Sequence, residues 1–410
     1  MRGNIVTGLD IGTNIVKALA LQRKGREWEV LSYAEIPSFG LRKGAVVNAE
    51  ETAKNIQLAL TEIENNCGQK IGSAFVNIGG SHLYVIPSDG IISVSRADQR
   101  ISQEDIDRVL QATKAINIPH NDEVLDVFPR EFVIDDQRGI RNPEGLTGVR
   151  LEAKVLLLCY FQHYFMNLTQ AVINSKLQID DIVPSPLAAA NSVLTPQQKE
   201  LGVALIDFGA NTTSLAVFEE GDLIHFAVFP IGSANITYDL AIGLKTDIQT
   251  AEAIKKQYGT CMIAKAVNDK ADQSKKKIEV TEKSSVLSFT KKNLVDIIEP
   301  RVSEILDLIQ KELKKINRQE LLPAGIVLTG GGAKLPKIKE LTKQQLKLPC
   351  EIGTPKGILG LNEDPSLATV AGLALGGVDF EGEEGILGAV KGWFSGHVFK
   401  FVKKLKVFIP

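Results

Sequence analysis

The chain has 410 residues, which corresponds to two or three domains of ordinary size. Apolar residues make up 44% and charged residues 23%, a composition typical of globular proteins and too apolar for a disordered one. Its 47 basic and 49 acidic side chains give a formal net charge of −2, which gives no support for a general nucleic-acid binder. The four cysteines lie far apart without C-x-x-C spacing, so we expect a reducing, cytoplasmic environment.

The N-terminal part is predicted to be a mixed α/β unit. Residues 4–23 read as a β-hairpin whose turn lies at 10–14. Residues 28–36 and 72–80 are predicted strands, and 49–67 is a predicted helix because its apolar residues recur at helical spacing. Asp10, an acidic residue within the first ten positions, argues against a signal peptide. No apolar run reaches the roughly 18 residues that a membrane-spanning helix needs.

The same order of elements returns in residues 203–232, as strand, turn at an aspartate, strand, turn and strand. A single aspartate followed by x-Gly and threonine could belong to any strand turn and is weak evidence of a binding site. Two copies in matching contexts favour an internal duplication. The residues of the two copies are Asp10, Gly12 and Thr13, then Asp207, Gly209, Thr212 and Thr213.

Four further segments complete the pattern. Residues 324–346 read as a strand, three glycines and a helix, and 366–377 as a small apolar helix. Ser102 begins a predicted helix over 102–116. The polar, basic stretch 268–284 is predicted to be a solvated loop.

Two facing turns of this kind can hold a nucleoside triphosphate, because backbone N–H groups and hydroxyls donate to phosphate oxygens. The strand-end carboxylates of Asp10 and Asp207 would face a hydrated Mg²⁺, which needs only one or two carboxylates. The sequence contains neither a P-loop motif nor the protein-kinase motifs.

These motifs resemble the superfamily of ATPases that includes actin, heat-shock chaperones and sugar kinases. Within it, the chain resembles the FtsA family of bacterial cell-division proteins over about residues 5–377. The segments VNIGGSHLYVIPSDGII (76–92) and FPREFVIDDQRGIRNPEGLTGVRLEAKV (128–155) resemble the subdomain inserted in that family. Residues 230–259 and 326–341 are also similar to it.

The resemblance implies an α/β, actin-like (ribonuclease H-like, duplicated) fold with two major domains, each carrying an inserted subdomain. The implied limits are 1–82 and 162–198 for subdomain 1A, 83–161 for the inserted subdomain 1C, 199–231 and 301–378 for subdomain 2A, 232–300 for subdomain 2B, 379–385 for a linker and 386–410 for an amphipathic membrane-targeting helix.

The resemblance also implies which residues bind ATP and Mg²⁺. The implied nucleotide-binding residues are Asp10, Gly12, Thr13, Asn14, Lys17, Asp207, Gly209, Asn211, Thr212, Thr213, Glu252, Lys255, Gly330, Gly331 and Gly332, with Asp10 and Asp207 facing Mg²⁺ through water. Lys17 has the spacing at which actin places a phosphate-contacting lysine. Glu252 and Lys255 share a helix face and would reach the adenosine, or would instead form a surface ion pair.

The sequence departs from the family at the hydrolytic step. Ala210 and Asn211 make the second turn less glycine-rich, and Ser214 replaces an acid. Asn191 stands where the family commonly has a glutamate, and no carboxylate occurs between Asp181 and Glu200. Because an amide cannot take a proton from water, we expect ATP binding with weak or no ATPase activity, and the catalytic residues stay unknown.

The C-terminal tail is predicted to bind a membrane surface. Residues 386–410 contain five lysines and no acid, and their apolar residues fall on one half of a helical wheel. The expected membrane contacts are Trp393, Phe394, Phe401, Lys403 and Lys404. Packing on the protein's own core and a membrane span are the alternatives; Lys391, His397 and Lys400 argue against a span.

The resemblance, together with the tail, implies an ATP-binding, actin-like protein that polymerises and anchors FtsZ filaments to the cytoplasmic membrane at the division septum. The partners implied are the FtsZ C-terminal tail, further copies of the chain, anionic lipids and other division proteins, with no nucleic acid. The FtsZ tail is expected on 233–300 and polymer contacts in part on 83–161. The alternatives are an actin-like pilus-assembly adaptor and a sugar- or acetate-type kinase.

Overall fold

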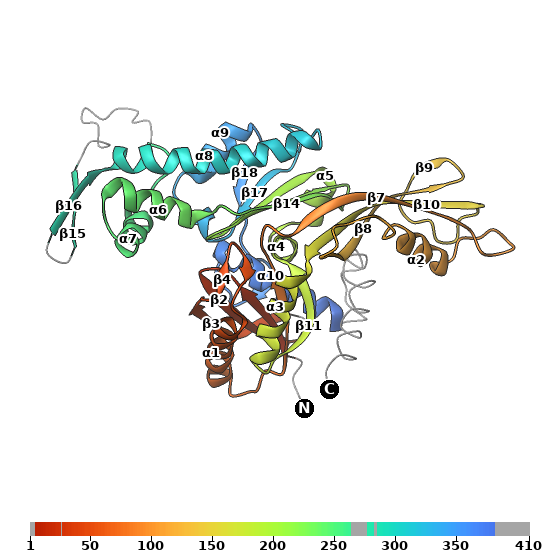
Figure 1. Cartoon of the computed structure of the whole chain (residues 1–410), viewed down its shortest axis with the longest axis horizontal. Helices are drawn as coiled ribbons and strands as arrows, with labels where there is room; N and C mark the ends of the chain where they lie inside the picture. The colour runs from red at the N-terminus through yellow and green to blue at the C-terminus, as the bar shows by residue number, and fades with distance from the viewer. Residues whose placement is uncertain (1–4, 26, 264–276, 283–284, 382–410) are drawn as a thin grey trace.

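A computed structural model describes residues 5–25, 27–263, 277–282 and 285–381 of the chain (Figure 1). The predicted membrane-targeting segment 386–410, with Trp393, Phe394, Phe401, Lys403 and Lys404, lies outside the described residues.

The first lobe is built on a six-stranded sheet in the order β11-β6-β1-β2-β3-β19. Its strands are β1 (Ile5–Ile11), β2 (Ile15–Lys24), β3 (Glu27–Pro37), β6 (Ser73–Ile78), β11 (Gln178–Pro184) and β19 (Ile358–Leu359). The predicted hairpin is confirmed, because β1 and β2 are antiparallel and Asp10 lies opposite Lys17. On its other side β1 runs parallel to β6, which is parallel to β11.

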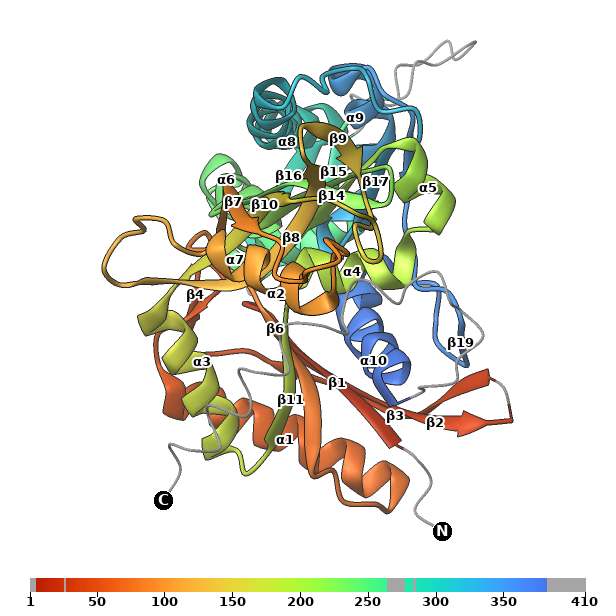
Figure 2. The same ribbon diagram turned by 90° about the vertical axis from the view of Figure 1, so that its right-hand side faces the viewer.

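Helices cover both faces of this sheet (Figure 2). Both faces are apolar because successive side chains of β2 point to opposite sides of the sheet. Ala18 and Ala20 pack in the core on the α1 side, whereas Leu19 and Leu21 pack against α10. The helices are α1 (Ala49–Cys67), α3 (Gln162–Asn174), α4 (Ser185–Val193) and α10 (Ala368–Glu381). The predicted helix over 49–67 is confirmed, and the one over 366–377 begins two residues later than predicted.

An inserted four-stranded sheet leaves the first lobe after β6 and returns to it at α3. It contains β7 (Tyr84–Ser93), β8 (Asp122–Ile134), β9 (Gln137–Ile140) and β10 (Arg150–Phe161), in the order β7-β10-β8-β9. Ser102 caps the single helix packed on it, α2 (Gln103–Ala112), through a capping box with Asp105. This helix ends four residues before the predicted limit.

The second lobe repeats the plan of the first. β12 (Val203–Phe208), β13 (Thr213–Glu219) and β14 (Asp222–Phe229) form an antiparallel meander, and β12 is parallel to β17 (Gly325–Thr329). β18 (Cys350–Ile352) completes the sheet. Because β1, β2, β3 and β6 pair in the same way, the duplication predicted from the two aspartate turns is visible in the topology.

The second insertion lies at the opposite end of the molecule from the first (Figure 1). It contains α6 (Ser233–Leu244), α7 (Ile248–Tyr258), β15 (Lys277–Glu282) and β16 (Ser285–Thr290), and leads into α8 (Lys291–Lys315); α5 (Pro196–Leu201) and α9 (Ile338–Leu346) belong to the second lobe. The loop predicted over 268–284 is wrong for Lys277–Glu282, which pairs with β16. The sequence-based subdomain limits stay a prediction.

Candidate functional site

The first aspartate turn is braced by an asparagine from the neighbouring strand. Asp10 is almost fully buried near the end of β1. The amide nitrogen of Asn77, in β6, donates to Asp10 Oδ1 at 2.8 Å and to Ser185 Oγ at 3.0 Å. Asn77 Oδ1 accepts from the backbone N–H of Ile11 at 2.7 Å. One side chain therefore fixes both the carboxylate and the backbone that enters the turn.

Lys17 places a positive charge beside the same carboxylate. Its Nζ lies 3.8 Å from Asp10 Oδ2 and donates to the carbonyl of Ser366 at 2.6 Å. Burial raises the pKa of Asp10, and the charge and hydrogen bonding of Lys17 oppose that rise. Lys17 therefore lies beside the first aspartate rather than out in solvent, and its contact with a phosphate stays a prediction.

The second aspartate turn is held by backbone hydrogen bonds. The N–H of Gly209 donates to the carbonyl of Thr212 at 2.9 Å, which closes the turn. The N–H groups of Ser233 and Ala234, at the start of α6, donate to the carbonyls of Gly209 and Ala210 at 2.9 and 2.8 Å. These hydrogen bonds attach the N-terminus of α6 directly to the second aspartate turn.

The two aspartates, which come from different lobes, lie within electrostatic reach of each other. Burial and, to a smaller extent, the charge of Asp10 raise the pKa of Asp207, Lys17 lowers it, and the result is a pKa of about 6. Two carboxylates and one ammonium thus share a small region between the lobes. Across the described ranges, no group of three or more His, Cys, Asp or Glu side chains is placed to hold a metal ion.

The glycine motif lies directly against the second aspartate. Gly330 has φ +83°, and a Cβ there would collide with Asp207 Oδ1. A Cβ on Gly332 would lie 2.7 Å from the ring of Phe208. A Cβ added at Gly331 would have no atom within 4 Å, so open space borders the chain at this residue. The motif therefore combines two closely packed glycines with one that leaves room for a flat ligand.

The pair on α7 is not a surface ion pair. Lys255 is 8% exposed, and its Nζ donates to Ser233 O at 3.0 Å, to Thr237 Oγ1 at 2.7 Å and to Glu252 Oε2 at 2.7 Å. These contacts use all three N–H bonds of the ammonium group. Burial would raise the pKa of Glu252, but hydrogen bonds from Lys255 and Thr237 lower it overall. Lys255 therefore positions α7 at the start of α6, beside the second turn.

The remaining predicted residues lie in the two turns. Gly12 and Thr13 are partly exposed and Asn14 is exposed; Asn211 and Thr212 are partly exposed in the second turn. Thr213 differs from them, since it is fully buried and its hydroxyl donates to the carbonyl of Ile231 at 2.9 Å. Its hydroxyl therefore holds the strand and does not face open space.

Sequence reasoning missed Asn77 and the hairpin that joins the lobes. A polar residue in the apolar strand at 72–80 was the available signal for Asn77. The hairpin consists of β4 (Leu41–Arg42) and β5 (Ala45–Val46). At its tip Gly44 has φ +83°, and a Cβ there would lie 2.6 Å from Gly80 Cα and 3.1 Å from Thr212 Cγ2. The hairpin thus brings the first lobe into contact with the second turn.

Comparisons with known proteins identify the family. The family model described as "Cell division protein FtsA" matches residues 204–372, and that described as "SHS2 domain inserted in FTSA" matches residues 80–159. The chain is 39% identical over 380 residues to the cell division protein FtsA of Pseudomonas aeruginosa, covering 92% of this chain and 90% of that protein. It is 34% identical over 369 residues to the Bacillus subtilis protein of the same name, covering 90% and 82%.

Solved structures support the actin-like fold. The chain matches a structure titled "PilM-PilN type IV pilus biogenesis complex" with a TM-score of 0.65 and 20% identity, covering 91% of this chain and 98% of that one. It matches MreB5 of Spiroplasma citri bound to ADP with a TM-score of 0.56 and 12% identity, covering 92% and 97%. The predicted actin-like α/β fold is confirmed. Among the described helices, none is long and apolar enough to cross a membrane.

Sequence identities of 20% or less to these solved structures show the fold alone. The identities of 34% and 39% to the two curated relatives favour the cell-division family over the pilus-assembly adaptor and the kinase that the sequence left as alternatives. The chain belongs to the FtsA family of cell-division proteins.

Proposed function

We propose that this protein binds ATP with Mg²⁺ between its two lobes, polymerises, and anchors FtsZ filaments to the inner face of the cytoplasmic membrane at the division septum. The observation that carries the nucleotide part is the pairing of Asp10 and Asp207 across the lobes, close enough for one charge to raise the pKa of the other. The partners and the septal location rest on membership of the family.

The residues present fit a magnesium nucleotide. The carboxylates of buried Asp10 and half-buried Asp207, both with raised pKa values, repel each other, and a divalent cation would relieve that repulsion. Asp10 and Asp207 would hold Mg²⁺ through water, and the cation would neutralise phosphate charge. Lys17 and the backbone of both turns would bind the phosphates, while the open side of Gly331 leaves space for the nucleoside. A solved actin-like structure is titled as bound to ADP.

Hydrolysis is expected to be weak. The helix that follows β11, α4, contains no carboxylate, and Asn191 on it is partly buried. An amide can orient a water molecule but cannot accept its proton. Phosphate release by the purified protein should stay well below about 1 s⁻¹, and turnover of that order would refute this part of the proposal.

The surfaces for partners are proposed on the two insertions. On α6 and α7 the exposed apolar side chains are Tyr238, Ile242 and Ile248, with Ile242 77% exposed. On the first insertion they are Ile91, Leu146 and Val149. Exposed apolar side chains within one subdomain favour protein contacts. We place the FtsZ tail on the first of these surfaces and part of the polymer contact on the second.

Membrane attachment rests on the sequence of the tail, whose lysines and aromatic residues suit an anionic lipid surface. Liposome co-sedimentation should be lost when 386–410 is deleted, and unchanged sedimentation would refute the anchor.

The decisive test of the whole proposal is localisation of a fluorescent fusion in dividing cells. A mid-cell ring that Asp207→Asn weakens is expected; an even membrane signal would overturn the septal role.

A further inference from the structure

A surface depression lies on the first lobe, beside the hairpin β4–β5, and its lining includes no residue of either aspartate turn. Its volume is about 240 Å³. Its lining residues are Arg42, Lys43, Ala45, Val47, Ser81, His82 and Tyr164. Ser81 and His82 lie three and four residues after the end of β6, whose carboxyl end lies beside those of β1 and β11. The crevice outside the carboxyl ends of parallel strands is where open α/β sheets bind ligands.

The rim of the depression carries two positive charges without acidic partners. Arg42 and Lys43 are exposed, and within the described part of the chain neither forms an ion pair. Ser81 and Tyr164 add two hydroxyl groups to the same lining. Ala45 and Val47 supply an apolar wall. The depression therefore offers several hydrogen-bond donors and a net positive charge on one side, and space for a carbon skeleton on the other.

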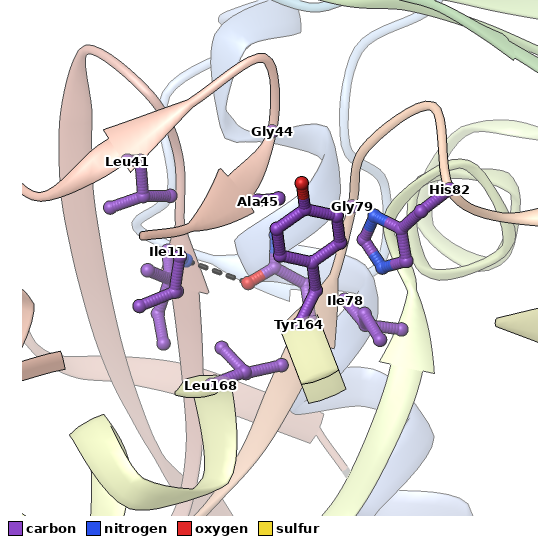
Figure 3. A pocket seen from close by; sticks show the side chains of 11 residues that line it. Ile11, Leu41, Gly44, Ala45, Ile78, Gly79, His82, Tyr164 and Leu168 are labelled. Carbon is purple, nitrogen blue, oxygen red and sulfur yellow. Dashed lines mark hydrogen bonds between the residues drawn. The ribbon is translucent and has the colours of Figure 1, made fainter. Parts of the chain in front are cut away.

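His82 forms the inner wall and has unused hydrogen-bonding groups. Both of its ring nitrogens are buried and neither has a partner in the described structure. Its ring lies against that of Tyr164, with centroids 5.0 Å apart (Figure 3). Burial lowers the pKa of His82 to about 4, with slight opposition from Asp122, so the imidazole is neutral and carries one donor and one acceptor. Leaving both groups unpaired in the interior is costly, which favours a ligand or water there.

A second, smaller cavity adjoins the depression through His82 and Tyr164. Its volume is about 10 Å³, which is room for about one water molecule. Asn77, which donates to Asp10, also lines this cavity, as does Ile11 (Figure 3 shows Ile11). The depression thus borders a small cavity at its inner end, and the side chain of Asn77 separates that cavity from Asp10.

We propose that this depression binds the phosphate group of a small anionic ligand, as an anion site separate from the two aspartate turns. A guanidinium group, an ammonium group, two hydroxyls and an imidazole offer more donors than the two oxygens of a carboxylate can use. A phosphate has more oxygens and about twice the charge. The volume exceeds that of one phosphate, so the ligand is either free phosphate with water or a phosphate monoester whose carbon part lies on Ala45 and Val47.

The test is isothermal titration of the full chain with inorganic phosphate and, separately, with glycerol phosphate, in the presence of saturating ADP. The double variant Arg42→Gln, Lys43→Gln should weaken phosphate binding by about tenfold or more, and Tyr164→Phe by about fivefold. Lys54→Gln, which removes an exposed lysine of α1, is the matched control and should leave binding unchanged. Binding of phosphate alone identifies free phosphate as the ligand, and tighter binding of glycerol phosphate identifies a monoester.

Three results would overturn the site: no binding of either probe to the wild-type chain, unchanged binding by the double variant, or equally tight binding of acetate. A thermal melt shows whether each variant is folded. Titration with ADP alone tests the nucleotide proposal independently, because Asp207→Asn should weaken ADP binding and leave phosphate binding in the depression intact.

Discussion

The two aspartate turns share one strand plan but are held in place by different kinds of group. Around Asp10 the braces are side chains, since Asn77 and Lys17 contact the carboxylate directly. Around Asp207 the braces are mainly backbone N–H groups and carbonyls at Gly209 and the start of α6. Substitutions of single side chains should therefore disturb the first turn far more than the second.

Removing Asn77 should have the largest effect. Asn77→Ala leaves the N–H of Ile11 and one oxygen of buried Asp10 without their partner, and we expect the free energy of unfolding to fall by about 3 kcal/mol. Urea unfolding of the nucleotide-free chain measures this. Asn167→Ala is the control, since that amide donates to the carbonyl of Val46 and otherwise contacts only the exposed His163 ring at 3.4 Å, so its loss should cost about 1 kcal/mol. Equal losses would contradict the role of Asn77.

The pH dependence of stability should report the second turn. The pKa of Asp207 is raised to about 6 in the folded protein, so its protonated form is favoured there. Its stabilising contribution is complete below about pH 4 and is lost as the pH rises through about 6, by an amount on the order of 3 kcal/mol. Asp207→Asn should lack this component in urea unfolding series without nucleotide. Parallel curves for the variant and the wild type would show that Asp207 is not perturbed.

Lys17 should matter for the ligand more than for the fold. In Lys17→Met the carboxylate of Asp10 loses its nearby positive charge and its pKa should rise further. ATP affinity, measured by titration, should weaken by about tenfold, the value of one lost charge-assisted contact. Lys24→Met, an exposed lysine on the same strand, should leave the affinity unchanged. Unaltered affinity in Lys17→Met would place the phosphates elsewhere.

The smallest effect should separate two adjacent threonines. Thr213→Val removes a buried hydrogen bond to Ile231 and should cost about 1 kcal/mol in unfolding free energy, with little change in ATP affinity. Thr212→Val, in the partly exposed turn, should cost less than about 0.5 kcal/mol but weaken ATP binding. Calorimetric melting and nucleotide titration of the two variants give the comparison. If Thr213→Val weakened ATP binding and Thr212→Val lowered stability instead, the Thr213 hydroxyl would be the one that contacts the nucleotide.

Much of the fold could be predicted because its signals are local. The hairpin at Asp10, the helix Ala49–Cys67 and the meander after Val203 follow from periodicity and turn residues within short segments. Strand β15 was missed because its alternating Ile278 and Val280 stand within a mostly polar stretch, and pairing with β16 decides its conformation. Asn77 was missed because it acts on Asp10 across 67 positions of the chain.

By itself, the sequence determined the repeated strand-and-turn units, the glycine motif and the charge pattern of the tail, because each depends on neighbouring residues along the chain. Only the tertiary structure decided that Asp10 and Asp207 lie within electrostatic reach. It also decided which predicted donors are already used: the Thr213 hydroxyl and the Lys255 ammonium are satisfied inside the protein. Hydrogen-bond saturation and burial depend on groups distant in sequence, and the packing of the two lobes alone brings them together.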